Sequence, residues 1–432
     1  MHPRGEALRE YLRGALWVLP GIAVVLALVA GSTLSHVRVR PHSPLHPLAF
    51  AGTADDARQV LIAIASTMVT VIALVLGLTV VALQVASTQF SPRLLRNFLR
   101  DRPNQVVLAV FVATFAYSTA GLYTVGVSGG GDVDEFPRIA VTGAIVLVFV
   151  SLGMLVFFVH HVAHSIQIDT VMTTVARTTA RGVLTWTAAE PAVDIEGPAP
   201  PPEAVVLTAS RSGYLQTAHP ERLLAAAQEQ DVVVSVLPWV GDHVVANVSP
   251  LALVWRSDGG VVKSPDSLAR ALRRAVQLGP ERTLQQDTAF GMRQLVDIAL
   301  RTLSPAINDP YSAVQVLDRL STVVCLLGIR ASGDTLCHDP SGTVRVVSRG
   351  PAFADHLDLA CGQIRRYGAA EPAVCLALLR MLGTTATVVT DPLRREAIAE
   401  QARLVLLDAE ARIAQPADLT AVRALGARLD LA

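Results

Sequence analysis

Lysine is almost absent from this sequence of 432 residues. Lys263 is the only lysine, and arginine supplies nearly all of the positive charge. The phosphate-binding loop G-x-x-x-x-G-K-[ST] is therefore missing, which argues against a P-loop ATPase or GTPase. An enzyme that forms a Schiff base would have to use Lys263, whose surroundings, GGVVK, show no other sign of that chemistry.

Cysteine and net charge are also scarce. The four cysteines form no C-x-x-C pair, and all of them follow the last long apolar run: Cys325, Cys337, Cys361 and Cys375. This pattern predicts reduced, mostly buried thiols in a cytoplasmic domain. Charged residues make up only 17% of the chain and the formal net charge is zero, so no nucleic-acid partner is expected.

Hydrophobic residues, in contrast, make up 51% of the sequence, which is too apolar for an ordinary soluble protein. Four apolar runs have the roughly twenty residues that a helix needs to cross a bilayer, and their interiors contain no Asp, Glu, Lys or Arg. These runs are residues 15–34, 60–85, 105–127 and 139–160. The first run is too long for a signal peptide and lacks a cleavage site, so we expect four transmembrane helices.

The positions of the arginines predict the orientation of these helices. Arginines precede the first run, cluster between the second and third, and follow the fourth, whereas the short third loop is acidic. Cytoplasmic loops of membrane proteins are enriched in basic residues. We therefore expect a multi-pass protein of the plasma membrane with both termini in the cytoplasm.

Small and polar residues recur along the second run at alternating steps of four and three, which places them on one stripe of a helix. The stripe includes Ser66, Thr70, Gly77 and Gln84. It is either a seam for packing against a neighbouring helix or the lining of a polar pathway in an oligomer, because small residues let helices approach closely in lipid.

The segment FSPRLLRNFLRD, residues 90–101, follows this run. It predicts a short amphipathic helix with Arg93, Arg96 and Arg100 on its polar face. Such a helix would lie on the cytoplasmic membrane surface with its arginines near lipid phosphates. The alternative is a solvated turn that docks on the cytoplasmic domain.

One helical turn separates His160 from His164 at the end of the fourth run, a spacing that can hold a metal ion. No Cys, Asp or Glu stands close enough in the sequence to complete a site. We therefore expect no metal and no other cofactor.

The remainder of the chain predicts a cytoplasmic α+β domain. After the four-span domain of residues 1–164, residues 165–202 form a connecting helix and a Pro/Ala linker. Residues 203–262 contain short β-branched runs that predict a small β-barrel-like part, and residues 263–432 are mainly helical. The expected helices are residues 267–278, 284–302, 310–327, 353–367, 372–382, 392–413 and 417–429, with one strand at 343–347.

The densest set of polar residues at helical spacing lies on the helix 284–302 and the turn that follows it. Arg293, Asp297 and Arg301 are four residues apart, so opposite charges are neighbours on the helix surface. Pro305 ends the helix, and Asp309 caps the next one. The candidate ligand or coupling site comprises Asp287, Arg293, Asp297, Arg301, Ser304, Asn308 and Asp309.

The stretch QDTAFGMRQLVDIALRTLSPAINDPYSA resembles the signature of domain-of-unknown-function family 2254, a bacterial membrane-protein family. The resemblance extends to VALQVASTQFSPRLLRNFLRD, RSGYLQ and LDLACGQIRRYGA, so it covers nearly the whole chain. It implies an integral membrane protein with a cytoplasmic domain. It brings no reaction, ligand or catalytic residue with it.

Three classes of function follow from these features. The favoured class is an oligomeric channel or transporter-like protein whose cytoplasmic domain assembles or gates it; the spans lack the ionisable residues typical of ion-coupled pumps. The second is a membrane-anchored sensor or scaffold that binds a ligand or partner. An enzyme would need Asp287, Asp297, Asp309 and His338 to gather at one site, and no catalytic residue is assigned. The expected partners are the lipid bilayer, further copies of the chain, and an unidentified small molecule or ion.

Overall fold

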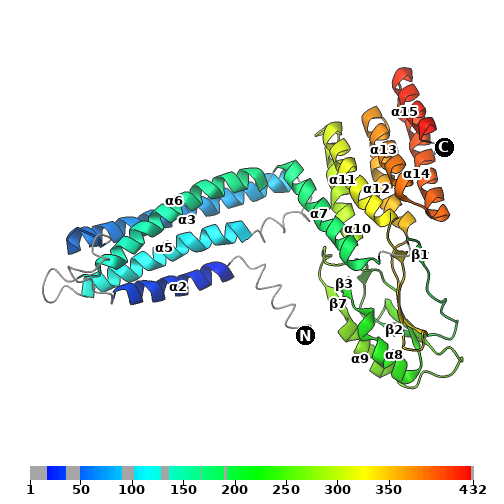
Figure 1. Ribbon diagram of the computed structural model, residues 1–432, viewed down its shortest axis with the longest axis horizontal. Helices are drawn as coiled ribbons and strands as arrows, with labels where there is room; N and C mark the ends of the chain where they lie inside the picture. Colours follow the sequence, from blue (N-terminus) through cyan, green and yellow to red (C-terminus); the bar gives the residue numbers. More distant parts are fainter. Residues whose placement is uncertain are drawn as a thin grey trace. The chain divides into compact units, whose positions relative to one another are not determined.

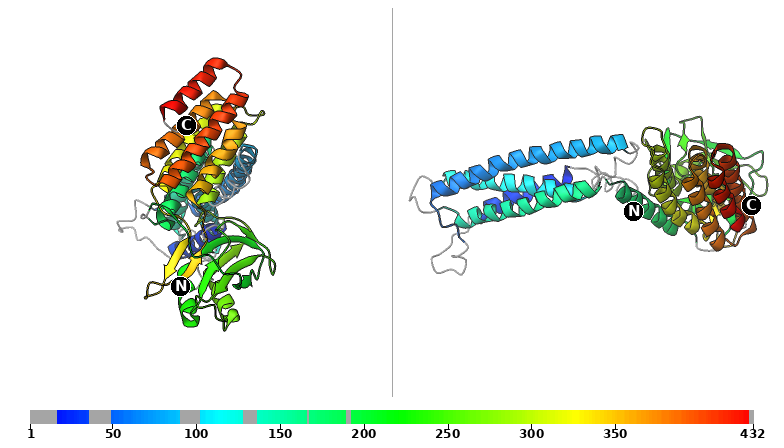
Figure 2. Two further views of the ribbon diagram at one scale, coloured as in Figure 1. Left: turned by 90° about the vertical axis from the view of Figure 1, so that its right-hand side faces the viewer. Right: turned by 90° about the horizontal axis from the view of Figure 1, so that it is seen from above.

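The apolar runs form a bundle of long helices. The computed structural model describes residues 17–35, 49–89, 102–127, 136–165, 167–188 and 192–429. The chain divides into two units, Met1–Thr170 and Val171–Ala432, each of which has its own internal contacts. Figures 1 and 2 show the ribbon of both units.

The first unit contains the helices α2 (Val18–Ser35), α3 (Ala54–Gln89), α5 (Arg102–Val127) and α6 (Arg138–Ser165), which lie side by side (Figure 1). The helices α3, α5 and α6 are long and apolar enough to cross a membrane. Three of the four predicted runs are therefore long apolar helices, as expected. The first predicted span corresponds to α2, which is apolar but shorter, so the count of four is not established by length and composition.

Small and hydroxyl-bearing residues hold this bundle together. A Cβ on Gly31 of α2 would lie 3.2 Å from Cβ of Ala120 on α5, so these two backbones approach closely. The hydroxyls of Thr114 and Ser151 are 2.9 Å apart and join α5 to α6 inside the bundle. Close packing and interhelical hydrogen bonds of this kind stabilise helix pairs in lipid, where the hydrophobic effect contributes little.

The helix α7 (Ile168–Trp186) follows α6 after two residues and leads into the second unit. Its buried residues include Met172, Val175, Thr179 and Val183, which share one face. Thr179 lies against Gly291 of α10 (Thr288–Thr302): a Cβ on Gly291 would lie 2.9 Å from Cβ of Thr179. The sequence predicts this helix from residue 284, but it begins at Thr288 because Asp287 is its N-cap.

The main sheet of the second unit has five strands in the order β2-β6-β4-β10-β9. They are β2 (Val205–Thr208), β6 (Pro250–Trp255), β4 (Val233–Val236), β10 (Val344–Ser348) and β9 (Thr335–His338). The pair β4–β10 is parallel and the other pairs are antiparallel. The strands do not close into the expected barrel, because β2 and β9 are the edges of an open sheet.

One face of this sheet is covered by η3 (Pro220–Arg222), α8 (Leu224–Gln230) and α9 (Pro265–Ala275). Leu268 and Leu272 of α9 are buried there in one apolar cluster with strand residues. The predicted helix 267–278 was too long at its end, because Val276–Gly279 forms a strand (β7) instead. A β-branched valine at the helix end favours that change.

Two smaller sheets complete the second unit. The strands β5 (His243–Val244), β3 (Gly213–Ala218) and β7 form one of them. In the other, β1 (Asp194–Ile195) pairs in parallel with β8 (Ser332–Gly333). The strand β1 belongs to the segment expected as a Pro/Ala linker, so the structure fixes that part of the linker to the fold.

The remaining helices form a layer beside α10, and Figure 1 shows them next to one another. They are α11 (Pro310–Gly328), α12 (Phe353–Tyr367), α13 (Pro372–Val388), α14 (Pro392–Arg412) and α15 (Pro416–Arg428). Four of these five helices begin with proline, whose fixed φ and missing N–H suit the first helical position. Leu378 and Leu382 of α13 are among the residues fully buried in this layer.

Candidate functional site

Asp287 precedes α10 and caps it. Its carboxylate accepts a hydrogen bond from the N–H of Phe290 at 2.8 Å. It also accepts two hydrogen bonds from the guanidinium of Arg282, at 2.7 Å from Nε and 2.8 Å from Nη2. The Asp287 side chain is 1% exposed and the Arg282 side chain is 29% exposed. Burial raises the pKa of Asp287 and Arg282 counteracts that shift, so Arg282 is what stabilises the buried carboxylate.

The turn that contains Gly241 packs closely against this ion pair. Gly241 has a φ of +105°, a conformation that favours glycine. A Cβ on Gly241 would lie 2.7 Å from Nη2 of Arg282 and would overlap Oδ2 of Asp287. Glycine is therefore needed here for its backbone conformation and for the space it leaves.

The RSGYLQ segment reaches the same place through β3. The side-chain nitrogen Nε2 of Gln216 donates a hydrogen bond to the backbone carbonyl of Glu281 at 2.8 Å. The N–H of Ala218 donates to Oε1 of Gln286 at 2.9 Å. Three segments that are distant in the sequence thus meet at one place, which we call the motif junction. It consists of Gln216, Gly241, Gly279, Arg282, Gln286 and Asp287.

The charged ladder on α10 contains one clear ion pair. Nε of Arg293 and Oδ1 of Asp297 are 2.9 Å apart, at the spacing of one helical turn. Arg301 lies one turn further along and also interacts within the chain. The structure therefore places Arg293, Asp297 and Arg301 along α10 as the sequence spacing predicts, and Arg293 pairs with Asp297.

The turn between α10 and α11 is held by its own polar groups. The hydroxyl of Ser304 donates a hydrogen bond to the carbonyl of Arg301 at 2.6 Å, and the N–H of Asn308 donates to the carbonyl of Ser304 at 2.8 Å. Asn308 has a φ of +50°, which asparagine tolerates better than most residues. The carboxylate of Asp309 accepts from the N–H of Ser312 at 3.0 Å and caps α11.

The acidic residues considered for catalysis do not gather. Asp287 and Asp309 flank opposite ends of α10, whose fifteen residues make it about 22 Å long. His338 lies on the edge strand β9, in a different layer. Among the residues that the structure describes, no group of three or more His, Cys, Asp or Glu side chains could hold a metal ion.

The small and polar stripe of α3 lies on the exposed side of that helix. Ser66, Thr70, Gly77 and Gln84 are all exposed, and a Cβ built on Gly77 would meet no atom within 4 Å apart from its chain neighbours and the backbone of its own helix. The stripe is therefore not a seam within the described bundle of one chain. Arg93, Arg96 and Arg100, expected at the membrane surface, lie outside the described residues.

A buried cluster that the sequence analysis missed joins several helix ends. The Arg394 side chain is 1% exposed; its Nη2 lies 2.7 Å from Oδ1 of Asp194, and its Nη1 donates to the carbonyls of Leu327, Gly328 and Arg330. Arginine at a helix C-terminus compensates the partial negative charge there. No spacing rule links Asp194 to Arg394, because 200 residues separate them.

Two neighbouring arginines act in the same way on other helices. Arg330 donates to the carbonyls of Leu184 and Thr187 at the end of α7. Arg395 donates to the carbonyls of Val389 and Ala386 at the end of α13. We call this cluster, consisting of Asp194, Arg330, Arg394 and Arg395, the arginine hub. It fixes the C-terminal ends of three helices at one end of the helical layer.

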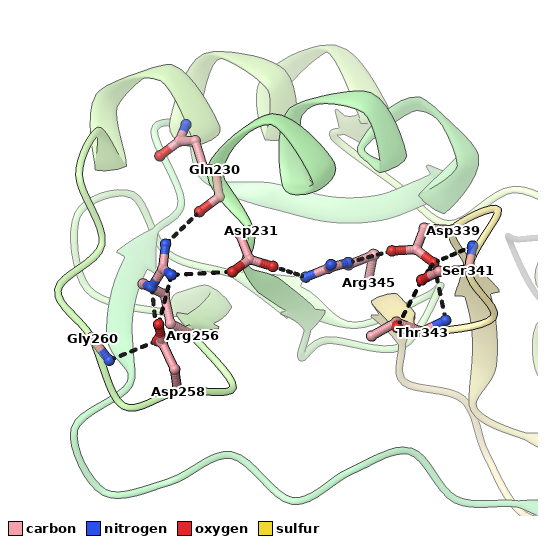
Figure 3. Close-up of polar contacts among 9 residues, drawn as sticks. All are labelled: Gln230, Asp231, Arg256, Asp258, Gly260, Asp339, Ser341, Thr343 and Arg345. Atoms are coloured by element: carbon pink, nitrogen blue, oxygen red, sulfur yellow. Dashed lines mark hydrogen bonds and ion pairs between the residues drawn. The ribbon is translucent and has the colours of Figure 1, made fainter.

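A second ion network ties the main sheet together (Figure 3). Asp231, at the end of α8, bridges Arg256 at 3.1 Å and Arg345 at 2.7 Å. Arg345 also contacts Asp339 at 2.8 Å, and Arg256 contacts Asp258 at 2.7 Å. The two arginines link the three carboxylates, so this network connects the end of β6 with β10 and keeps one net negative charge.

These arrangements offer no nucleophile paired with a base among the described residues, and their charged side chains are engaged in ion pairs or in hydrogen bonds to carbonyls. The half-buried Arg282 at the motif junction is the group best placed to meet an anionic ligand, since its guanidinium is fixed by Asp287 and lies over the ring of Phe290 at 5.2 Å. The exposed stripe of α3 is suited to helix contacts in lipid.

Comparison with known proteins agrees with this architecture. The family model described as "Predicted membrane protein (DUF2254)" matches residues 13–384. Two similar proteins are the uncharacterised protein Rv1290c of Mycobacterium tuberculosis and the uncharacterised protein Mb1321c of Mycobacterium bovis. Each is 44% identical over 428 residues, which cover 98% of this chain and 82% of theirs. No solved structure matches the chain. The chain therefore belongs to the DUF2254 family of predicted membrane proteins.

Proposed function

We propose that this membrane protein is an oligomeric channel or transporter-like protein in which the stripe of α3 lies between copies and borders a pathway for ions or small solutes. The observation that carries this proposal is the position of the stripe. The buried residues of α3 include Leu61, Ile64, Met68 and Val75. At 100° per residue the stripe lies about 180° from them, on the opposite side of the helix.

The chemistry of the stripe favours a protein neighbour over lipid alone. The hydroxyls of Ser66 and Thr70 donate to carbonyls of their own helix at 3.0 and 3.4 Å. Placing these hydroxyls in hydrocarbon therefore costs little free energy. The amide of Gln84 has more hydrogen-bonding capacity and gains more from a polar partner or water. The missing side chain at Gly77 leaves room for a close helix approach.

The topology of the proposed channel has four spans. The helix α2 has 18 residues, about 27 Å, which is close to the hydrocarbon thickness of a bilayer. Its Ala27 is buried in the same apolar cluster as residues of α3, α5 and α6, which supports a transmembrane position. An even number of spans leaves both termini on the same side of the membrane. The arginine distribution favours the cytoplasmic side for them, in a protein of the plasma membrane.

The connection from α6 to α7 supports a gating role for the second unit. The helix α7 is fixed within that unit by the contact of Thr179 with Gly291 and by the hydrogen bonds from Arg330. Only two residues separate α7 from α6. A ligand that changes the second unit would therefore act on α6 through a short covalent link.

Purified protein in liposomes tests the pathway. Wild-type protein is expected to release ions or small solutes faster than empty vesicles do. Gly77→Leu should lower that flux by tenfold or so, on the order of 1.4 kcal/mol, because a bulky side chain fills the space between copies. Val69→Leu is the matched control: Val69 is also exposed on α3 but lies off the stripe, so its flux should stay at the wild-type level.

Two results would contradict the pathway: flux no greater than that of empty vesicles across several solutes, or equal effects of Gly77→Leu and Val69→Leu. The second candidate, a membrane-anchored sensor or scaffold, is favoured by the meeting of three segments around the half-buried Arg282. A small anion that raises the thermal stability of the full chain, together with no flux, would support that alternative.

A further inference from the structure

One end of the helical layer lies level with the start of α7. Thr179 of α7 contacts Gly291 of α10, and Gly182 lies opposite Thr288, so the two helices run antiparallel. Thr179 lies eleven residues, or about 16 Å along the helix axis, after the first residue of α7. Gly291 lies the same distance before the last residue of α10. The turn after α10 therefore lies beside the first residues of α7.

The same end also carries the C-terminus of α12. Arg394 donates to the carbonyl of Gly328 at the end of α11 and lies over the ring of Phe353 at the start of α12, 5.2 Å from its centroid. The helices α11 and α12 thus run in opposite directions, and Tyr367 at the end of α12 lies near the start of α11. We call this end, with Ile307, Tyr311, Arg366 and Tyr367 on it, the turn end.

The side chains at the turn end are apolar or aromatic and exposed. Ile307 is 45% exposed, Tyr311 71% and Tyr367 68%, and Arg366 beside Tyr367 is also exposed. The turn that presents Ile307 is fixed by the hydrogen bonds of Ser304 and Asn308, so its shape is set before any partner binds. Tyrosine with an apolar ring and a polar tip, next to arginine, is the composition typical of the membrane–water interface.

We propose that the turn end rests on the headgroup layer of the bilayer and is attracted to anionic lipid. The covalent structure supplies the reason: α6 ends at Ser165 and α7 begins at Ile168, so three Cα steps of 3.8 Å keep these two residues within about 11 Å. Within the second unit the turn end lies beside the start of α7, so this short covalent link limits how far the turn end can lie from the last residue of α6. This proposal holds whether or not α3 borders a pathway.

Two carboxylates near the turn end are engaged with other groups of the chain. Asp309 is engaged with Ser312 and the first turn of α11. Asp408 is paired with Arg365, next to Arg366. Glu371, before α13, also lies at this end. The exposed Arg366 is the group that meets lipid phosphates in this proposal, and one basic residue at an anionic surface strengthens binding about fivefold.

A nitroxide label on the full chain tests the proposal. Tyr311→Cys and, in a separate chain, Ile307→Cys carry the label; Leu393→Cys is the control, because Leu393 is 75% exposed and lies at the opposite end, beside the arginine hub. Cys325 and Cys337 are replaced by serine. Cys361 and Cys375 stay, since burial raises the pKa of Cys361 to about 12 and that of Cys375 to about 11, which suppresses labelling.

The measurement is the accessibility of each label to oxygen and to a water-soluble nickel chelate. It is made in nanodiscs with one chain each, of phosphatidylcholine with or without phosphatidylglycerol. We expect labels at 307 and 311 to be severalfold more accessible to oxygen, relative to nickel, than the label at 393. Phosphatidylglycerol should increase the difference, and Arg366→Gln should abolish that increase.

Equal accessibility at positions 311 and 393 would overturn the proposal. So would protection that appears only in discs with two chains, because a second copy would then cover the turn end instead of lipid. A difference that does not respond to phosphatidylglycerol would overturn the role of anionic lipid.

Discussion

At the scale of single residues, the second unit depends on arginines whose partners lie far away in the sequence. Arg394 uses its guanidinium to bind Asp194 and three carbonyls at the end of α11. Arg282 does the same for the buried Asp287. Arginine suits both places because it stays charged and presents several donors in one plane. Replacement of arginine by lysine at these positions would lose most of those bonds.

His356 makes the stability of the second unit depend on pH. Burial lowers the pKa of His356, although the carbonyl of Ala352 and the carboxylates of Asp355, Asp194 and Asp287 favour the charged form. The unfolded chain therefore binds a proton at a pH where the native imidazole stays neutral. The free energy of unfolding should fall as the pH drops below the ordinary histidine pKa, by at most about 1.4 kcal/mol per pH unit.

Thermal unfolding of the full chain in detergent between pH 7.5 and pH 5 measures this dependence. His356→Gln removes the titrating group and should flatten the curve in that range. Equal pH dependence in the wild type and in His356→Gln would show that other groups dominate.

At the scale of elements, the sequence predicts helices better than strands. Proline at the first position and aspartate before it mark the starts of α11 and α14, and both helices begin where expected. The strand β9 was missed because Thr335–His338 has little strand character alone and depends on pairing with β10. The sequence predicts the residues of β7 as the end of a helix for the same reason, since the partner strand β3 lies some sixty residues earlier.

The contact between α7 and α10 depends on Gly291. Alanine at this position would force its Cβ against Thr179 and is expected to destabilise the second unit by about 1–3 kcal/mol. Gly182→Ala is the matched control: the nearest atom to its Cβ would be 3.9 Å away, so the better helix propensity of alanine should make it neutral or stabilising by up to about 1 kcal/mol.

The measurement is the midpoint of thermal unfolding, which should be lower for Gly291→Ala than for Gly182→Ala. A Gly291→Ala chain as stable as Gly182→Ala would mean that Thr179 can rotate away without cost.

At the scale of the whole molecule, three helices long and apolar enough to cross a membrane and a mixed helical and sheet region were predictable from composition and periodicity. The outward position of the α3 stripe was not. Residues 61, 64, 68, 75 and 82 repeat at the same steps of three, four and seven as the stripe does, so the sequence offers two faces with equal periodicity. The candidate site was predictable only for Asp287, because Arg282, Gly241 and Gln216 come from separate segments.

The arginine hub connects β1 with three helices, so its loss should affect the whole second unit. Arg394→Met leaves Asp194 without its arginine partner and three carbonyls without this donor, and is expected to cost about 3–5 kcal/mol. Arg395→Met, at the adjacent but exposed position, should cost about 1 kcal/mol or less. Limited proteolysis and thermal unfolding of the full chain would compare them; similar losses for both would contradict the special place of Arg394.

The pairing of Asp194 with Arg394 also has a consequence for biogenesis. The 200 residues between them take about 10–40 s to synthesise at usual elongation rates. During that interval the apolar helices have already left the ribosome, while the second unit still lacks the arginine that closes its fold. The second unit is therefore expected to complete its fold only after the C-terminal helices have been synthesised.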